Sequence, residues 1–110
     1  MKEQPSKNIE LVFRIAEDDA LALEKSEKTY GDSWKRRGGV GAFMMLARKW
    51  DRLENICKKT NYDIFEAIKK DPSFSGILDD MQDLRRYLLL VESEMEIDGV
   101  IKKSRIPNEE

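Results

Sequence analysis

The chain has 110 residues, of which 40% are hydrophobic and 38% are charged, with 20 basic side chains against 22 acidic ones. This length favours one domain, and the composition is typical of a highly charged helical protein rather than of a membrane or disordered one. The net charge of −2 argues against sequence-independent nucleic-acid binding, which needs an overall positive field. No segment approaches the roughly 18 apolar residues of a membrane helix, so we expect a cytoplasmic protein with no membrane partner.

Two residue types limit the chemistry that the chain could perform. Cys57 is the only cysteine, and the sequence contains no histidine. A single cysteine excludes an intramolecular disulfide, and the lack of histidine excludes catalytic schemes that pair serine or cysteine with histidine. Carboxylates, lysine, tyrosine and a hard cation such as Mg²⁺ therefore remain for any catalysis.

Apolar residues recur with a helical period along most of the chain and predict an all-α fold, a bundle of about four helices. The helices are expected over residues 9–29, 40–59, 62 or 63–70, and 77–97. Gly31 should end the first helix, and Asp71-Pro72-Ser73 should close the third, because a residue before proline avoids helical geometry. The expected organisation is a flexible N-terminus (1–8), a single helical domain (9–97) and an extended C-terminal tail (98–110).

A glycine-rich basic loop follows the first expected helix. Lys35, Arg36 and Arg37 stand between Gly31 and the glycines at 38, 39 and 41. Backbone N–H groups and cations that precede a helix suit phosphate binding. A solvated turn explains the basic run equally well when it is considered alone.

Four charged residues project into the expected apolar faces of the helices: Asp19, Glu27, Lys49 and Asp80. Buried charges are normally paired, bound to metal or exposed to a wet cavity. Carboxylates at helical spacing could hold Mg²⁺, namely Glu24, Glu27, Asp79, Asp80 and Asp83. Lys49 and Arg52 would then contact phosphate oxygens. Alternatively, an ion pair between Glu27 and Lys49 would explain both residues without a ligand.

Three separated blocks resemble MazG-like proteins, in particular the phage and bacterial branch associated with nucleotide modification. The blocks are Tyr30-Gly31-Asp32-Ser33-Trp34, the run 48–53 with Asn55, and the run 79–84 with Tyr87. The resemblance covers about residues 28–90. It implies an all-α nucleotide pyrophosphohydrolase-like fold, usually a dimer or higher oligomer, that binds a nucleoside phosphate with magnesium.

The blocks also depart from the pattern of that family at two carboxylates. Arg48 and Leu78 stand where the family has acidic residues. Losing two carboxylates weakens a metal cluster more than it weakens a basic phosphate pocket. The resemblance therefore supports nucleotide binding better than hydrolysis.

The sequence leaves three functions open. The first is a nucleotide-phosphate-binding, Mg²⁺-dependent nucleoside triphosphate pyrophosphohydrolase with Glu27 and Asp83 as catalytic carboxylates. The second is a non-catalytic phage protein that binds and sequesters a nucleotide signal of host defence, and the third is an oligomeric helical interaction module. The expected partners are a nucleotide or nucleotide-derived small molecule and further copies of the chain. The residues expected to bind the nucleotide or its phosphates are Tyr30, Trp34, Lys35, Arg36, Arg37, Arg48, Lys49, Arg52 and Tyr87.

Overall fold

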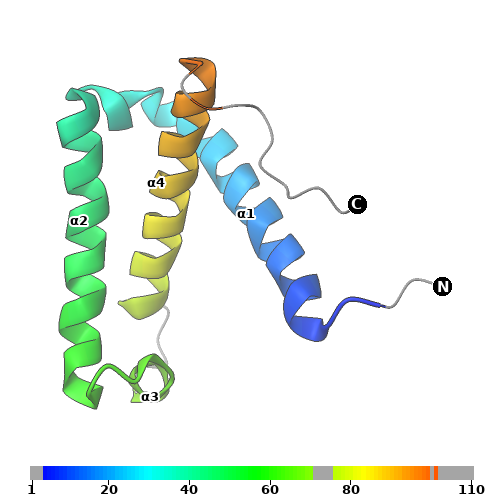
Figure 1. The fold of residues 1–110 in the computed structure, drawn as a ribbon, viewed down its shortest axis with the longest axis vertical. Helices are drawn as coiled ribbons and strands as arrows, with labels where there is room; N and C mark the ends of the chain where they lie inside the picture. The colour runs from blue at the N-terminus through cyan, green and yellow to red at the C-terminus, as the bar shows by residue number, and fades with distance from the viewer. Residues whose placement is uncertain (1–3, 71–75, 100, 102–110) are drawn as a thin grey trace.

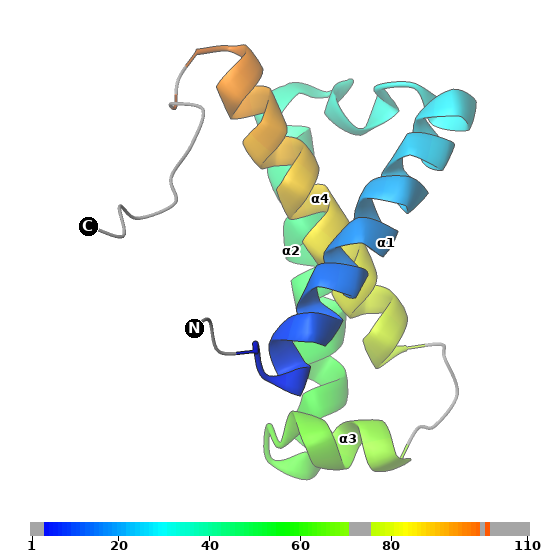
Figure 2. The same cartoon turned by 90° about the vertical axis from the view of Figure 1, so that its right-hand side faces the viewer.

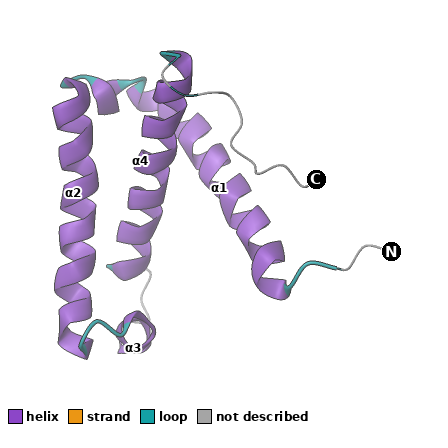
Figure 3. Cartoon of the chain, in the orientation of Figure 1, coloured by secondary structure: helices purple, strands orange, loops and turns teal. Residues whose placement is uncertain are grey.

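The structure, a computed structural model, describes residues 4–70, 76–99 and 101. This part of the chain is all-helical and contains no strand, which confirms the predicted fold class (Figure 3). Its elements are α1 (Lys7–Tyr30), the 3₁₀ helix η1 (Ser33–Lys35), α2 (Gly38–Cys57), the 3₁₀ helix η2 (Lys58–Thr60), α3 (Ile64–Lys70) and α4 (Ile77–Ile97).

Local chemistry explains where the helices begin and end. Ser6 caps α1 by accepting a 3.3 Å hydrogen bond from the Ile9 amide. Gly31, with φ of 59°, ends the helix as predicted, and its amide donates to the Glu27 carbonyl at 2.8 Å. The expected bounds of α4 are confirmed, whereas α2 begins two residues early and its last expected residues form η2. The expected end of the third helix at residues 71–73 lies outside the described residues, as does most of the expected tail.

α2 and α4 form an antiparallel pair, and α4 lies between α2 and α1 (Figure 1). α1 crosses α4 obliquely on the side away from α2 (Figure 2). α3 lies across one end of the α2–α4 pair, and the small core is located there. Its buried apolar side chains are Leu53, Cys57, Ala67 and Ile77.

Much of the apolar surface that the sequence predicted to be inside is exposed. Helical periodicity places Phe13, Phe43, Trp50 and Leu88 on the apolar faces of their helices, yet Phe13 is 72% exposed and the other three are also exposed. The prediction was wrong for these residues because α1 crosses α4 instead of lying along it, so one chain covers only part of each helical face. None of the described helices combines the length and apolar character required to cross a bilayer.

Candidate functional site

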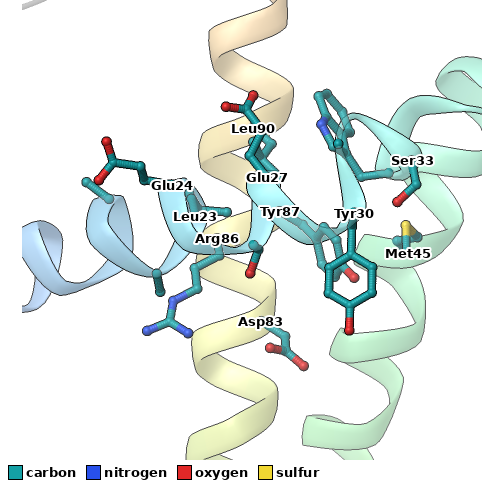
Figure 4. Close-up of a pocket in the computed structure, with 15 residues that line it drawn as sticks. Leu23, Glu24, Glu27, Tyr30, Ser33, Met45, Asp83, Arg86, Tyr87 and Leu90 are labelled. Carbon is teal, nitrogen blue, oxygen red and sulfur yellow. The ribbon is translucent and has the colours of Figure 1, made fainter.

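A half-open pocket of about 560 Å³ lies between the C-terminal half of α1, η1 and the middle of α4 (Figure 4). Three aromatic side chains line it, namely Tyr30, Trp34 and Tyr87, and Arg86 contributes a cation. Met45 reaches the pocket from α2. The fold thus gathers residues that are far apart in the sequence into one aromatic cavity, whose wall carries Arg86 and the carboxylates of Glu24, Glu27 and Asp83.

A smaller cavity of about 160 Å³ adjoins this pocket at η1. It shares Ser33, Trp34 and Met45 with the larger one and is also lined by Arg37 and Gly41. One cation of the predicted basic loop therefore stands beside the aromatic wall.

Asp19 holds α1 against α4 through a cluster of ion pairs, which we call the Asp19 cluster. Its side chain is 1% exposed, and its two oxygens accept hydrogen bonds from Arg85 at 2.5 and 2.9 Å and from Arg86 at 2.8 Å. The sequence placed Asp19 at the edge of an apolar face but indicated no partner for it. Because Arg86 also lines the pocket, this cluster positions part of the pocket wall.

The Asp19 cluster shifts the ionisation of its members. Hydrogen bonds from the Arg85 guanidinium hold the pKa of the Asp19 carboxyl below its usual value, although burial opposes this effect. The same hydrogen bond raises the pKa of Arg85. Both groups are therefore charged at neutral pH, and the ion pairs are intact there.

Lys35 of the basic loop is occupied by a contact within the chain. Its Nζ donates to Glu94 Oε1 at 3.0 Å, and this bond raises the pKa of Lys35. The contact ties η1 to the C-terminal part of α4. Lys35, which the sequence suggested for phosphate, thus has a structural partner.

Two further ion pairs join α2 to α4. Lys49 Nζ lies 2.9 Å from Asp83, and Arg52 Nε lies 3.2 Å from the fully buried Asp80. The prediction that Asp80 faces inward is confirmed by its burial, and Lys49, which was predicted to do the same, is partly buried with its side chain 18% exposed. Their charges are balanced across the helix pair.

The expectation that Glu27 faces the core is wrong, because its side chain is exposed and Lys49 pairs with Asp83. Glu27 follows Asp19 by eight residues and therefore lies about 80° away from it around the helix. α1 turns the face of Asp19 toward α4. Glu27 is left at the edge of the pocket.

The five carboxylates suggested for Mg²⁺ do not come together in one chain. Glu24, Glu27 and Asp79 are exposed, and in Figure 4 the carboxylates of Glu24 and Glu27 lie on the other side of α1 from Asp83. Within the described residues, no group of three or more His, Cys, Asp or Glu could hold a metal ion. Three of the five predicted carboxylates, Glu24, Glu27 and Asp83, line the same pocket without forming such a group.

The basic residues suggested for phosphate are distributed over different surfaces. Arg36 and Arg48 are exposed, and neither lines one of the two cavities. Among the basic residues that the sequence suggested for phosphate, Arg37 lines the smaller cavity, and the others line neither of the two cavities. Sequence reasoning missed Arg86, since nothing local to residue 86 indicates that α1 lies next to it.

No protein-family profile, curated protein or solved structure matches this chain. The resemblance to MazG-like proteins therefore stays a prediction based on three residue blocks. The argument for function rests on the pocket and on the charges around it.

Replacing Asp19 with asparagine should destabilise the fold. Hydrogen bonds to charged groups contribute roughly 1.5–3 kcal/mol, so we expect the free energy of unfolding of Asp19→Asn to fall by about 2 kcal/mol in urea titrations followed by circular dichroism. Asp18→Asn is the matched control, because Asp18 is the exposed neighbour. Equal losses in the two variants at one protein concentration would contradict the role of the cluster.

The stabilising effect of Asp19 should depend on pH. Because its pKa is lowered by folding, the unfolded chain binds the proton more readily, and stability is lost as pH falls below the ordinary value of 3.8. The difference in unfolding free energy between the wild type and Asp19→Asn should therefore be constant above about pH 5 and shrink toward about pH 3. A difference in unfolding free energy that does not change between about pH 5 and about pH 3 would contradict the lowered pKa of Asp19 in the folded chain.

Proposed function

We propose that the chain binds a nucleotide or nucleotide-derived small molecule in the pocket between α1, η1 and α4. The observation that carries this proposal is the set of three aromatic side chains beside Arg86, with Arg37 in the adjoining cavity. Aromatic side chains stack with nucleobases, and the guanidinium group pairs with phosphate oxygens in a bidentate manner. The pocket thus combines the two chemistries that a nucleotide presents.

The size of the pocket supports the same proposal. Pockets for small molecules are typically about 300–1,000 Å³, and this one measures about 560 Å³. A base and its sugar fit such a volume, and the phosphates would extend toward Arg37. Arg36, the residue before Arg37, is exposed and would add to the positive electrostatic potential at the rim of the pocket.

The ion pairs favour binding over hydrolysis. A metal-dependent hydrolase needs carboxylates that hold the metal and activate water, yet Asp80 and Asp83 are engaged by Arg52 and Lys49. We therefore favour the non-catalytic alternative, in which a cytoplasmic phage protein binds and sequesters a nucleotide signal of host defence. The Mg²⁺-dependent pyrophosphohydrolase is the competing proposal.

We also propose that the chain works as a homo-oligomer, a dimer or higher. Large apolar side chains are exposed on all four α helices. A second copy would cover surface that one chain leaves open.

Tryptophan fluorescence offers a direct test of binding, because Trp34 lines the pocket and Trp50 does not. In Trp50→Phe, the remaining emission should be quenched by at least one of the common ribo- or deoxyribonucleoside triphosphates. Mass spectrometry of small molecules released by denaturing the purified protein should identify any nucleotide that it retains. If no member of the panel binds and no nucleotide is retained, the proposed function is wrong.

Two arginine variants locate the phosphates. Arg37→Ala should raise the dissociation constant about tenfold, since a charge-assisted contact contributes roughly 1.5 kcal/mol. Arg48→Ala should leave it unchanged, because Arg48 lines neither cavity. Equal effects of the two substitutions would argue against phosphate at the η1 end of the pocket.

A turnover assay separates binding from hydrolysis. Incubation with the same nucleotides and Mg²⁺ should return them intact, because Asp83 is paired with Lys49 and the exposed carboxylates of Glu24 and Glu27 form no metal cluster with it. Release of pyrophosphate that is abolished in Asp83→Asn would support the competing hydrolase. The nucleotides and pyrophosphate are quantified by chromatography and a coupled phosphate assay.

A further inference from the structure

We propose that the pocket between α1, η1 and α4 selects a nucleotide whose heteroaromatic ring carries a positive charge. This selectivity rests on the proposed function, because it narrows the ligand of the same site to one class of nucleotide. Three features favour such a ring: the acidic lining of the larger pocket, the carboxylates that flank its aromatic side chains, and the opposite charge of the adjoining cavity.

The described lining of the larger pocket carries more negative than positive charge. Its carboxylates belong to Glu24, Glu27 and Asp83, and its cation is Arg86. The cation already donates a hydrogen bond to Asp19 at 2.8 Å. Lys49 compensates Asp83 at 2.9 Å, but the other two carboxylates form no ion pair within the described residues. The uncompensated charge is therefore negative, which attracts a cationic group and repels a phosphate.

Carboxylates flank the aromatic side chains of the pocket from two sides. Asp83 precedes Tyr87 by four residues on α4, so their side chains are neighbours on one face of the helix. Figure 4 shows the Asp83 carboxylate on the same side of α1 as the Tyr30 ring. The carboxylates of Glu24 and Glu27 lie across α1 from them. Because aromatic ring faces attract cations and nearby carboxylates add Coulomb attraction, the pocket combines two groups that bind positive charge.

The adjoining cavity has the opposite charge. Arg37 is the one charged group among its described lining residues, and this cavity shares Ser33, Trp34 and Met45 with the larger pocket. A ligand that passes Trp34 would place one end among carboxylates and its other end at a guanidinium group. A nucleotide with a cationic ring has this distribution of charge, since its ring is positive and its phosphates are negative. A neutral base would leave the acidic end without a counter-charge.

The aromatic lining favours a flat cation over a metal ion or an aliphatic amine. Tyr30, Trp34 and Tyr87 present ring faces to the pocket, on which a charged heteroaromatic ring gains stacking as well as cation–π attraction. Two kinds of nucleotide carry such a ring. One is an oxidised nicotinamide nucleotide, whose pyridinium ring is charged, and the other is a nucleotide of N7-methylated guanine.

Isothermal titration calorimetry of the full chain with two matched ligand pairs tests this selectivity. The pairs are 7-methyl-GTP with GTP, and NAD⁺ with NADH, and each pair differs in ring charge while keeping nearly the same shape. EDTA in the buffer removes divalent metal that could replace the ring charge, and a slightly acidic pH keeps the methylated guanine cationic. At least one cationic member should bind about tenfold more tightly than its neutral counterpart. The pair that discriminates identifies the source of the ring.

Two variants assign the preference to the pocket. Glu27→Gln should lower the ratio of the two affinities about threefold, as expected for one exposed charge. Glu17→Gln is the matched control, because Glu17 is an exposed glutamate of the same helix that lines neither cavity, and it should keep the wild-type ratio. Tyr30→Leu should lower the ratio as well, because it removes a ring face, and the 69% exposure of Tyr30 makes the substitution compatible with the fold.

The outcomes separate this selectivity from the proposed function. Equal affinities within both pairs, or binding of a common triphosphate by a chain that binds neither cationic ligand, would overturn the selectivity and leave nucleotide binding in place. An equal fall of the ratio in Glu27→Gln and Glu17→Gln would assign the preference to the charge of the whole chain and would also overturn it. Binding of no nucleotide at all would overturn both.

Discussion

A buried carboxylate held between two guanidinium groups determines how α1 meets the rest of the molecule. Asp19 is almost fully buried, and an unpaired charge there would be strongly destabilising. Its hydrogen bonds to Arg85 and Arg86 compensate for that burial and hold α1 across α4. The crossing forms one wall of the pocket and leaves the opposite face of the α2–α4 pair uncovered. The geometry of the candidate site therefore depends on this contact.

Charge pairing also separates structural from ligand-binding groups. The sequence predicts that Lys49 and Arg52 bind phosphate, but in the structure they pair with Asp83 and Asp80 and set the register of α2 on α4. The pocket itself is lined by aromatic side chains, by Arg86, which also pairs with Asp19, and by the carboxylates of Glu24, Glu27 and Asp83, with Arg37 in the adjoining cavity. Of these charged groups, Glu24, Glu27 and Arg37 are exposed and form no ion pair within the described residues.

The sequence by itself determined the helices, because their causes are local. Apolar periodicity set the bounds of α4, and the terminal Gly31 set the end of α1. The sequence also identified Lys49 and Asp80 as inward charges. Only the tertiary structure decided that Asp19 pairs with arginines 66 and 67 residues away, that Glu27 is exposed, and that Phe43 is uncovered. Those outcomes depend on the crossing angle and register of helices, which arise from packing between distant segments and leave no periodic pattern in the chain.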